Sequence, residues 1–249
     1  MKRGIIIVCL MLFCACSERN KKLSAQEIVD RSIEVSGGDR YATRKISFDF
    51  RAILYTSVPM GNQKILTRQL RTDSTQILDV KSPKGFERFI NDSLVKLPDT
   101  AATAYANAVN SVHYFAYLPY GLNDKAVQKR YLETTKIDSS EYHKIEVTFN
   151  ENGGGDDFDD TYIYWFNTKT FKPEYLAYEF HVDGGGHRFR AAFNERVVGG
   201  IRFVDYKNYK NTNLEISIYN IDSLYLSDNL ELLSEIKLEN IKVTPGSYN

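Results

Sequence analysis

The segment Thr161-Tyr-Ile-Tyr-Trp-Phe-Asn167 has the composition of a β-strand, and it decides the fold class. Alternate side chains of a strand point to opposite faces of the sheet. The two faces therefore carry different sets, with Tyr162, Tyr164 and Phe166 on one and Ile163 and Trp165 on the other. Because both faces are apolar, each must be covered by helices, by a ligand or by both.

Similar strand-like segments lie on both sides of this one. In the C-terminal half they are Gln128–Lys136, His143–Asn150, Glu174–Val182, His187–Val197, Ile201–Asn208 and Leu214–Ile221. In the N-terminal half they are Ile46–Tyr55, Lys64–Thr72, Thr75–Val80, Phe86–Ile90 and Ser93–Lys96. Short polar or glycine-containing turns separate most of them, so the pattern predicts an antiparallel meander.

Two helices are predicted among these strands. Ser24 and Glu27 form a capping-box pattern before a helix over Ala25–Ser36, which Gly37-Gly38 ends. A second helix begins at Asp99 or Thr100 and runs to about Ala116. Its residues carry almost no charge, which is typical of a buried helix. We therefore predict an α+β, mainly β fold: a curved antiparallel sheet, or incomplete barrel, with one or two helices covering its concave face.

The N-terminus has the pattern of an export signal. Lys2 and Arg3 precede an apolar run over 5–13, which is too short to span a bilayer, and Ala15 precedes Cys16. We expect a lipoprotein signal peptide over 1–15, lipidation of Cys16, a tether over 16–23 and a single domain over 24–249. A plain secretory signal is the alternative. The pattern predicts a lipid anchor in the cell envelope, with the outer membrane as the expected location.

Composition limits the chemistry of this domain. The formal net charge is +0, so nothing points to a nucleic-acid partner. All three cysteines lie within the first sixteen residues, which excludes disulfides, thiolate metal sites and cysteine nucleophiles from the rest of the chain. The sequence contains no nucleophile elbow, P-loop or dinucleotide fingerprint. We therefore assign no catalytic residue and expect no cofactor.

Four segments carry a resemblance to known proteins, namely Tyr105–Asp124, Gly153–Asp160, Asp183–Arg190 and Val197–Lys210. They resemble a family of Bacteroidota lipoproteins of unknown function. More distantly, the layout is similar to the outer-membrane lipoprotein carriers and related lipid-binding lipoproteins. This resemblance implies a curved, incomplete antiparallel barrel whose mouth is plugged by helices and whose apolar cavity holds acyl chains. It implies no catalytic residue.

Periodicity suggests which side chains would face such a cavity. From the second helix these are Tyr105, Val109, Val112 and Phe115, and from the sheet Tyr55, Tyr164, Phe166 and Phe180. The alternative is that the same residues form an ordinary filled core, because aromatic residues at helical spacing are usually core.

Three polar groups are weaker candidates for a site. Arg188 and Arg190 share a strand face and could clamp an anion, although a solvated face is the alternative. An acidic loop containing Asp156, Asp157 and Asp159 offers oxygen ligands for calcium, or is simply a solvated hairpin loop. The hairpin flanked by His181 and His187 offers ligands for zinc, or is an ordinary glycine turn.

Three functions remain open from the sequence. The first is an anchored protein that binds a lipid or another hydrophobic ligand in a half-barrel cavity. The second is a structural or partner-binding envelope lipoprotein without a small ligand. The third is a metal-dependent enzyme that uses the 151–160 loop and the 181–190 hairpin.

Overall fold

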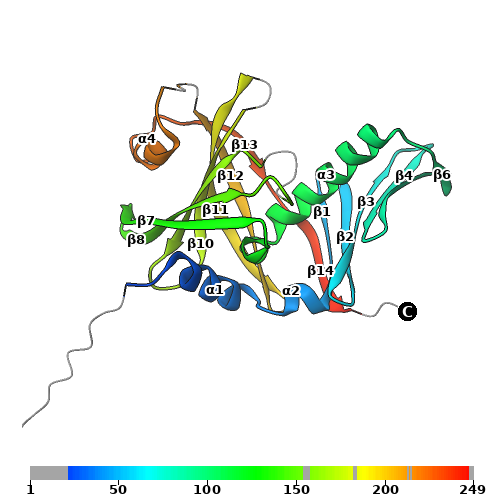
Figure 1. Cartoon of the computed structure of the whole chain (residues 1–249), viewed down its shortest axis with the longest axis horizontal. Coiled ribbons are helices and arrows are strands. Elements are labelled where there is room, and N and C mark those ends of the chain that lie inside the picture. Colours follow the sequence, from blue (N-terminus) through cyan, green and yellow to red (C-terminus); the bar gives the residue numbers. More distant parts are fainter. Residues whose placement is uncertain (1–21, 154–157, 182–183, 212, 214, 247–249) are drawn as a thin grey trace, which may run out of the picture.

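The computed structural model describes residues 22–153, 158–181, 184–211, 213 and 215–246. These residues form two curved, seven-stranded antiparallel sheets that do not close into a barrel (Figure 1). The mainly β fold with a curved, incomplete barrel predicted from the sequence is confirmed. Cys16 and the predicted signal peptide lie outside the described residues, as do Asp156 and Asp157.

The first sheet, sheet A, has the strand order β14-β1-β2-β3-β4-β5-β6. Its strands are β1 (Arg44–Phe50), β2 (Ile53–Met60), β3 (Gln63–Arg71), β4 (Gln76–Ser82), β5 (Gly85–Ile90), β6 (Ser93–Val95) and β14 (Glu239–Pro245). The sheet is a simple meander from β1 to β6, and only β14 comes from a distant part of the chain.

The second sheet, sheet B, has the strand order β13-β12-β11-β10-β9-β8-β7. Its strands are β7 (Val127–Ile137), β8 (Ser140–Phe149), β9 (Thr161–Asn167), β10 (Pro173–Phe180), β11 (Gly186–Val198), β12 (Ile201–Asn211) and β13 (Glu231–Ile236). It is likewise a continuous meander, as the turn pattern predicted.

The last two strands link the sheets. β13 lies at the edge of sheet B, and β14 pairs with β1 at the edge of sheet A. Between them, Leu238 donates its N–H to Asp205 Oδ1 at 3.0 Å. The Arg196 guanidinium bonds both the Asp205 carboxylate and the Leu238 carbonyl. These hydrogen bonds hold the chain in place where it passes from sheet B to sheet A.

Helices cover both faces of sheet B. We call the face that carries Tyr164 and Phe166 the inner face, and the opposite one the outer face. On the inner face, α1 (Ala25–Ser36) contributes Ile28 and Val29 to the core, and its predicted capping box is present. The outer face is covered by η3 (Ile218–Asn220) and α4 (Ile221–Leu226). The chain also contains two helices of four residues each, α2 (Arg40–Thr43) and the 3-10 helix η1 (Tyr120–Asn123).

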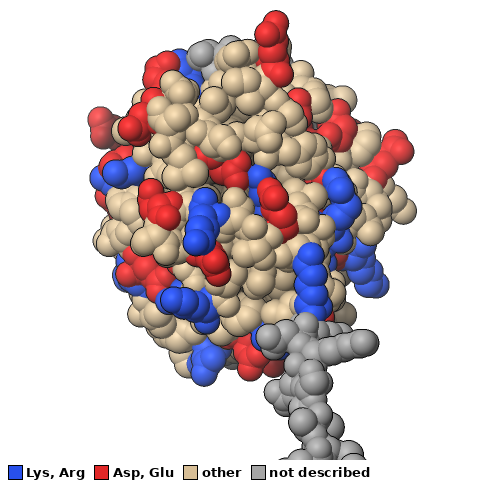
Figure 2. Space-filling model, turned by 90° about the vertical axis from the view of Figure 1, so that its left-hand side faces the viewer, with Lys and Arg blue, Asp and Glu red and all other residues tan. Residues whose placement is uncertain are grey.

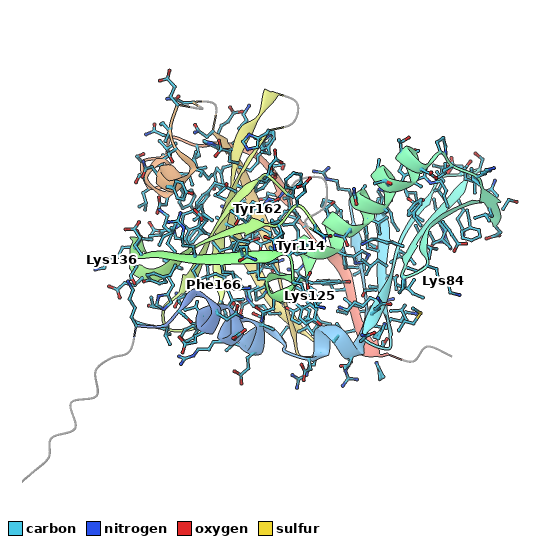
Figure 3. The ribbon with its side chains drawn as sticks, in the orientation of Figure 1. Lys84, Tyr114, Lys125, Lys136, Tyr162 and Phe166 are labelled. Atoms are coloured by element: carbon cyan, nitrogen blue, oxygen red, sulfur yellow. The ribbon has the colours of Figure 1, made fainter. Side chains whose placement is uncertain are left out.

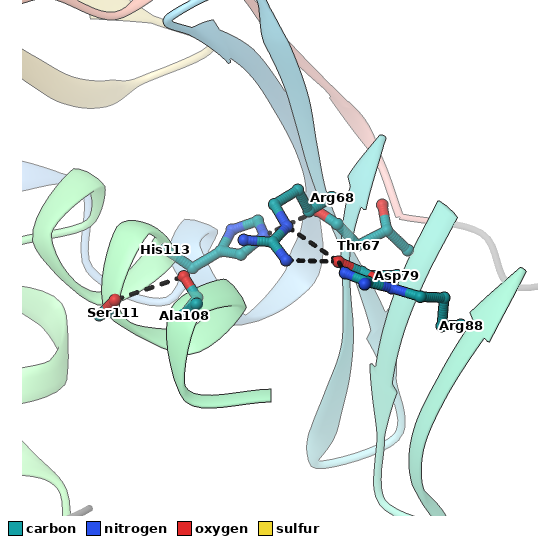
Figure 4. Close-up of polar contacts among 7 residues, drawn as sticks. All are labelled: Thr67, Arg68, Asp79, Arg88, Ala108, Ser111 and His113. Atoms are coloured by element: carbon teal, nitrogen blue, oxygen red, sulfur yellow. Dashed lines mark hydrogen bonds and ion pairs between the residues drawn. The ribbon is translucent and has the colours of Figure 1, made fainter. Parts of the chain in front are cut away.

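Helix α3 (Asp99–Ala116) lies across sheet A, and its C-terminal end reaches sheet B (Figure 1). His113 attaches it to sheet A through the Thr67 carbonyl, at 3.2 Å (Figure 4). Asn110 accepts a bond from Lys81 of β4 at 2.8 Å. On the other side, Phe115 packs against Tyr162 and Tyr178 of sheet B. The helix thus bridges the two sheets.

Three details differ from the sequence prediction. The predicted strand Ile46–Tyr55 is two strands, because Arg51 and Ala52 form a tight turn with φ angles of 52° and 60°. The predicted strand Leu214–Ile221 is wrong, because its described residues form turn and irregular structure over 215–217 and then η3 and the start of α4. Strands β13 and β14 were not foreseen. None of the helices in the described part of the chain is both long and apolar enough to cross a membrane.

Candidate functional site

A partly enclosed cavity of about 280 Å³ lies between the C-terminal half of α3, the inner face of sheet B and the β1–β2 turn. Its apolar and aromatic lining consists of Phe50, Val112, Phe115, Ala116, Val204, Tyr206, Ile236 and Leu238. Its polar lining includes Arg51, Ser111, Arg190 and Asn208. The site is therefore an apolar space with a small number of polar groups, which is the usual composition of a small-molecule site.

Local periodicity explains why these side chains meet. On α3, Val112, Phe115 and Ala116 are three and four residues apart and so lie on one helix face. On β12, Val204 and Asn208 share the inner face because strand side chains alternate. The cavity lies where this face of α3 is opposite sheet B, whereas His113 of the same helix contacts sheet A.

Arg190 is the charged group on the sheet B wall of this cavity. Its guanidinium carbon lies 4.6 Å from the ring centroid of Phe115 and 5.2 Å from that of Tyr178. Nη2 donates to the Tyr178 hydroxyl at 3.1 Å, whereas Nε is buried and has no hydrogen-bond partner among the described residues. The cation is thus surrounded by aromatic faces and one phenol, which compensate its charge only weakly.

Other polar atoms of the cavity wall and of the inner core are also buried without a partner among the described residues. Asn208 is the cross-strand neighbour of Arg190, and its Oδ1 accepts no bond within the described chain. The same is true of the hydroxyl groups of Tyr164 and Tyr114. Burial raises the pKa of Tyr164 well above its ordinary value, and the neighbouring tyrosines add to this effect. Its phenol therefore stays protonated and neutral.

Figure 3 shows Tyr114 and Tyr162 between the end of α3 and sheet B, and Phe166 further along the inner face. Tyr164 and Phe166 are fully buried in the core that α1 covers. Of the eight side chains predicted to face a cavity, Val112 and Phe115 line this one.

The remaining predicted cavity residues lie elsewhere. Tyr55 is buried in sheet A, where its ring stacks on Phe48 with centroids 5.5 Å apart. Val109 is fully buried on α3. Tyr105 lies near the start of α3, with the Arg88 guanidinium 3.5 Å from its ring centroid. Phe180 lies at the end of β10, under the side chain of Arg188.

Several lining residues were not among the predicted site residues. Val204 belongs to a correctly predicted strand, and its alternation would have identified it. Ile236 lies on β13, which was not foreseen. Phe50 directly precedes the unpredicted turn, and Arg51 is its first residue.

The two arginines of the predicted anion clamp have different surroundings. Arg190 lines the cavity. Arg188 instead donates to the His187 carbonyl at 3.0 Å and lies 4.7 Å from the centroid of the Phe180 ring. A joint clamp by the two guanidinium groups stays a prediction.

The metal candidates are dispersed or lie outside the described residues. Asp159 and His181 are exposed. His187 is buried, with Asn211 at 3.3 Å and Glu179 at 3.6 Å. Among the described residues, no group of three or more His, Cys, Asp or Glu side chains is arranged to hold a metal ion. On the face seen in Figure 2, basic and acidic side chains are interspersed.

Comparison with protein families identifies relatives of this chain. Residues 77–240, more than half of the chain, match the model of DUF6503, a family of unknown function. The chain belongs to this family. The predicted resemblance to a family of unknown function is confirmed, whereas its restriction to Bacteroidota stays a prediction. No curated protein matches the sequence.

Solved structures with a similar fold include a LolA superfamily protein from Nitrosomonas europaea, with a TM-score of 0.49, 13% identity and coverage of 90% of this chain and 92% of that one. A DUF1329 family protein from Desulfovibrio piger gives a TM-score of 0.45 and 8% identity, over 91% of this chain and 96% of that one. A putative outer membrane lipoprotein-sorting protein domain from Vibrio parahaemolyticus gives a TM-score of 0.35 and 8% identity, over 80% of this chain and 99% of that one.

Proposed function

We propose that this protein is a membrane-anchored envelope lipoprotein that binds a lipid or another hydrophobic ligand in the cavity between α3 and sheet B. The observation that carries the proposal is the cavity itself, a partly enclosed space with an apolar lining from both sheets and α3. Apolar surface that leaves water on binding contributes about 25 cal/mol per Å². A ligand with an aliphatic portion gains the most from such a lining.

The proposed envelope location and lipid anchor rest on the N-terminal sequence, with its basic start, its short apolar run and Cys16. A lipid anchor keeps the domain at one membrane, because several acyl chains together give stable binding. The ligand would then reach the cavity from that membrane or from a passing carrier.

The proposal is tested by what the protein carries when purified. The full-length chain is isolated from its own membranes at low detergent and analysed by native mass spectrometry, followed by solvent extraction of any bound mass. Val112→Trp places an indole in the cavity and is expected to remove the bound ligand. Ala104→Trp adds the same group at an exposed position of α3 and serves as the control.

We expect wild type and Ala104→Trp to carry a hydrophobic ligand and Val112→Trp to carry little or none. If wild type carries no ligand and takes up none from added lipids, the proposed function is wrong. Equal occupancy in all three proteins would place the ligand outside this cavity.

A further inference from the structure

We infer that the ligand is a single-chain anionic amphiphile whose carboxylate or phosphate head binds Arg190 while its chain occupies the cavity. This inference rests on the proposed function and adds the chemical class of the ligand. It is drawn from the charge of the cavity wall, from the absence of an anionic partner for Arg190 among the described residues and from the size of the space.

The charge of the wall is one-sided. Among the described residues that line the cavity, Arg51 and Arg190 are cationic and none is acidic. The whole chain has a formal net charge of +0, so this is a local excess of positive charge. Arg190 is half-buried, whereas Arg51 is exposed. A half-buried cation beside a low-dielectric apolar wall attracts an anionic group more strongly than it would in open solvent.

The pairing of Arg190 differs from that of its neighbours. On the same sheet, Arg202 Nε bonds Glu195 at 2.7 Å and Arg196 Nη2 bonds Asp205 at 2.8 Å. No carboxylate of the described residues forms an ion pair with Arg190, and its Nε–H has no acceptor there. A half-buried cation without an anionic partner is unfavourable, so an incoming carboxylate or phosphate would satisfy both the charge and the free donor.

Asn208 lies beside Arg190 and forms the polar end of the site together with it. Asn208 faces Arg190 in the strand register and donates its amide to Ser234. Its Oδ1 has no donor among the described residues, and as an acceptor it can bond only a head that carries an O–H, such as a monoprotonated phosphate. The apolar lining of Val112, Phe115 and Val204 lies beside this polar pair. Head and chain of an amphiphile would therefore find complementary groups in one continuous space.

The size of the cavity limits the number of chains. Its volume of about 280 Å³ is just below the range of about 300–1,000 Å³ that is usual for ligand sites. A ligand with one alkyl chain fits this space better than a lipid with two or three chains.

The experiment compares ligands that share a chain and differ in the head. Dodecanoate, dodecyl phosphate and neutral dodecanol compete with the uncharged fluorescent probe N-phenylnaphthylamine for the full-length wild-type protein. A charge-assisted hydrogen bond is lost with the alcohol, so we expect at least one of the two anions to bind about tenfold to a hundredfold more tightly. Whichever anion binds more tightly identifies the head as carboxylate or phosphate.

Arg190→Met then tests the residue, because Met keeps an unbranched apolar side chain and removes the charge. We expect it to lose the preference for the anion and to keep its affinity for dodecanol. Lys207→Met removes one charge from an exposed position on the opposite face of β12 and should keep the wild-type preference. A thermal melt of each variant confirms that it is folded.

The two proposals fail in different ways. If wild type binds the anions no better than dodecanol, or if folded Arg190→Met keeps the preference, the assignment of the head is wrong and the hydrophobic cavity stands. If wild type binds neither the probe nor any of the amphiphiles, the proposed function is wrong as well. The wild-type comparison needs no variant, so it decides the inference even if Arg190→Met does not fold.

Discussion

His113 should make the stability of this protein depend on pH between about 6.5 and 4. The ring is buried between α3 and sheet A, with Nε2 at 3.2 Å from the Thr67 carbonyl (Figure 4). Its Nδ1 lies 3.1 Å from the Tyr117 hydroxyl. Since a carbonyl only accepts, Nε2–H is the donor, and Nδ1 of the neutral ring accepts from the tyrosine. Both ring nitrogens are therefore satisfied without a charge.

Burial lowers the pKa of His113 from 6.5 to about 4. The bond to the Thr67 carbonyl opposes this shift, and the Lys64 and Lys81 ammonium groups add to it. Below pH 6.5 the unfolded chain takes up the proton while the folded chain does not, so stability falls as the pH falls. With 1.36 kcal/mol per pKa unit, the loss between pH 7 and pH 4 amounts to about 3 kcal/mol.

The assay is urea unfolding of wild type and His113→Gln at several pH values from 7 to 4. Gln has no charge at any of these values, and the other titrating groups contribute equally to both proteins. The difference in the free energy of unfolding between the two should therefore change by about 3 kcal/mol over this range, to the disadvantage of wild type at low pH. Parallel curves, with a difference constant to within about 0.5 kcal/mol, would refute the argument that His113 is buried in its neutral form.

Three further predictions concern Asp79, Asp222 and Cys16. Asp79 is fully buried between Arg68 and Arg88, so Asp79→Ala should lower the free energy of unfolding by about 3–5 kcal/mol. The exposed control Asp73→Ala should not lower it. Equal melting temperatures for the two variants would contradict the pairing. Asp222 accepts from the indole of Trp165, the only tryptophan, at 3.3 Å. Asp222→Ala should admit water at the outer face and shift the tryptophan emission to the red, and an unchanged spectrum would show that α4 does not depend on this carboxylate. Cys16→Ser should release the protein from the membrane fraction, and unchanged membrane association would exclude the lipid anchor.

Much of the fold was readable from alternation and turn chemistry. The strands of sheet B and the capped helix α1 follow from local patterns, because their side-chain periods of two and 3.6 are visible in any window of sequence. The turn at Arg51-Ala52 was not readable, because neither residue is a turn former and both adopt a positive φ that the tertiary structure imposes. The pairing of β14 with β1 joins the two ends of the domain, and no local pattern reports such a contact.

Only part of the candidate site could be predicted from the sequence, because local patterns do not show which elements pack against one another. Periodicity identified the face of α3 with Val112 and Phe115, and it put Arg188 and Arg190 on one strand face without showing whether that face is inner or solvated. It could not tell whether the space opposite a given side chain is filled. Tyr164 and Phe166 lie under α1, and Tyr55 packs on Phe48, so these aromatic residues form core instead of lining the cavity. That difference depends on how helices from elsewhere in the chain dock onto the sheet.

The most direct test of the central claim is a crystal structure of the protein with dodecanoate. We expect density for one alkyl chain between α3 and the inner face of sheet B, with the carboxylate within hydrogen-bond distance of the Arg190 guanidinium. Density on the outer face, or a carboxylate that points away from Arg190 into solvent, would contradict the account.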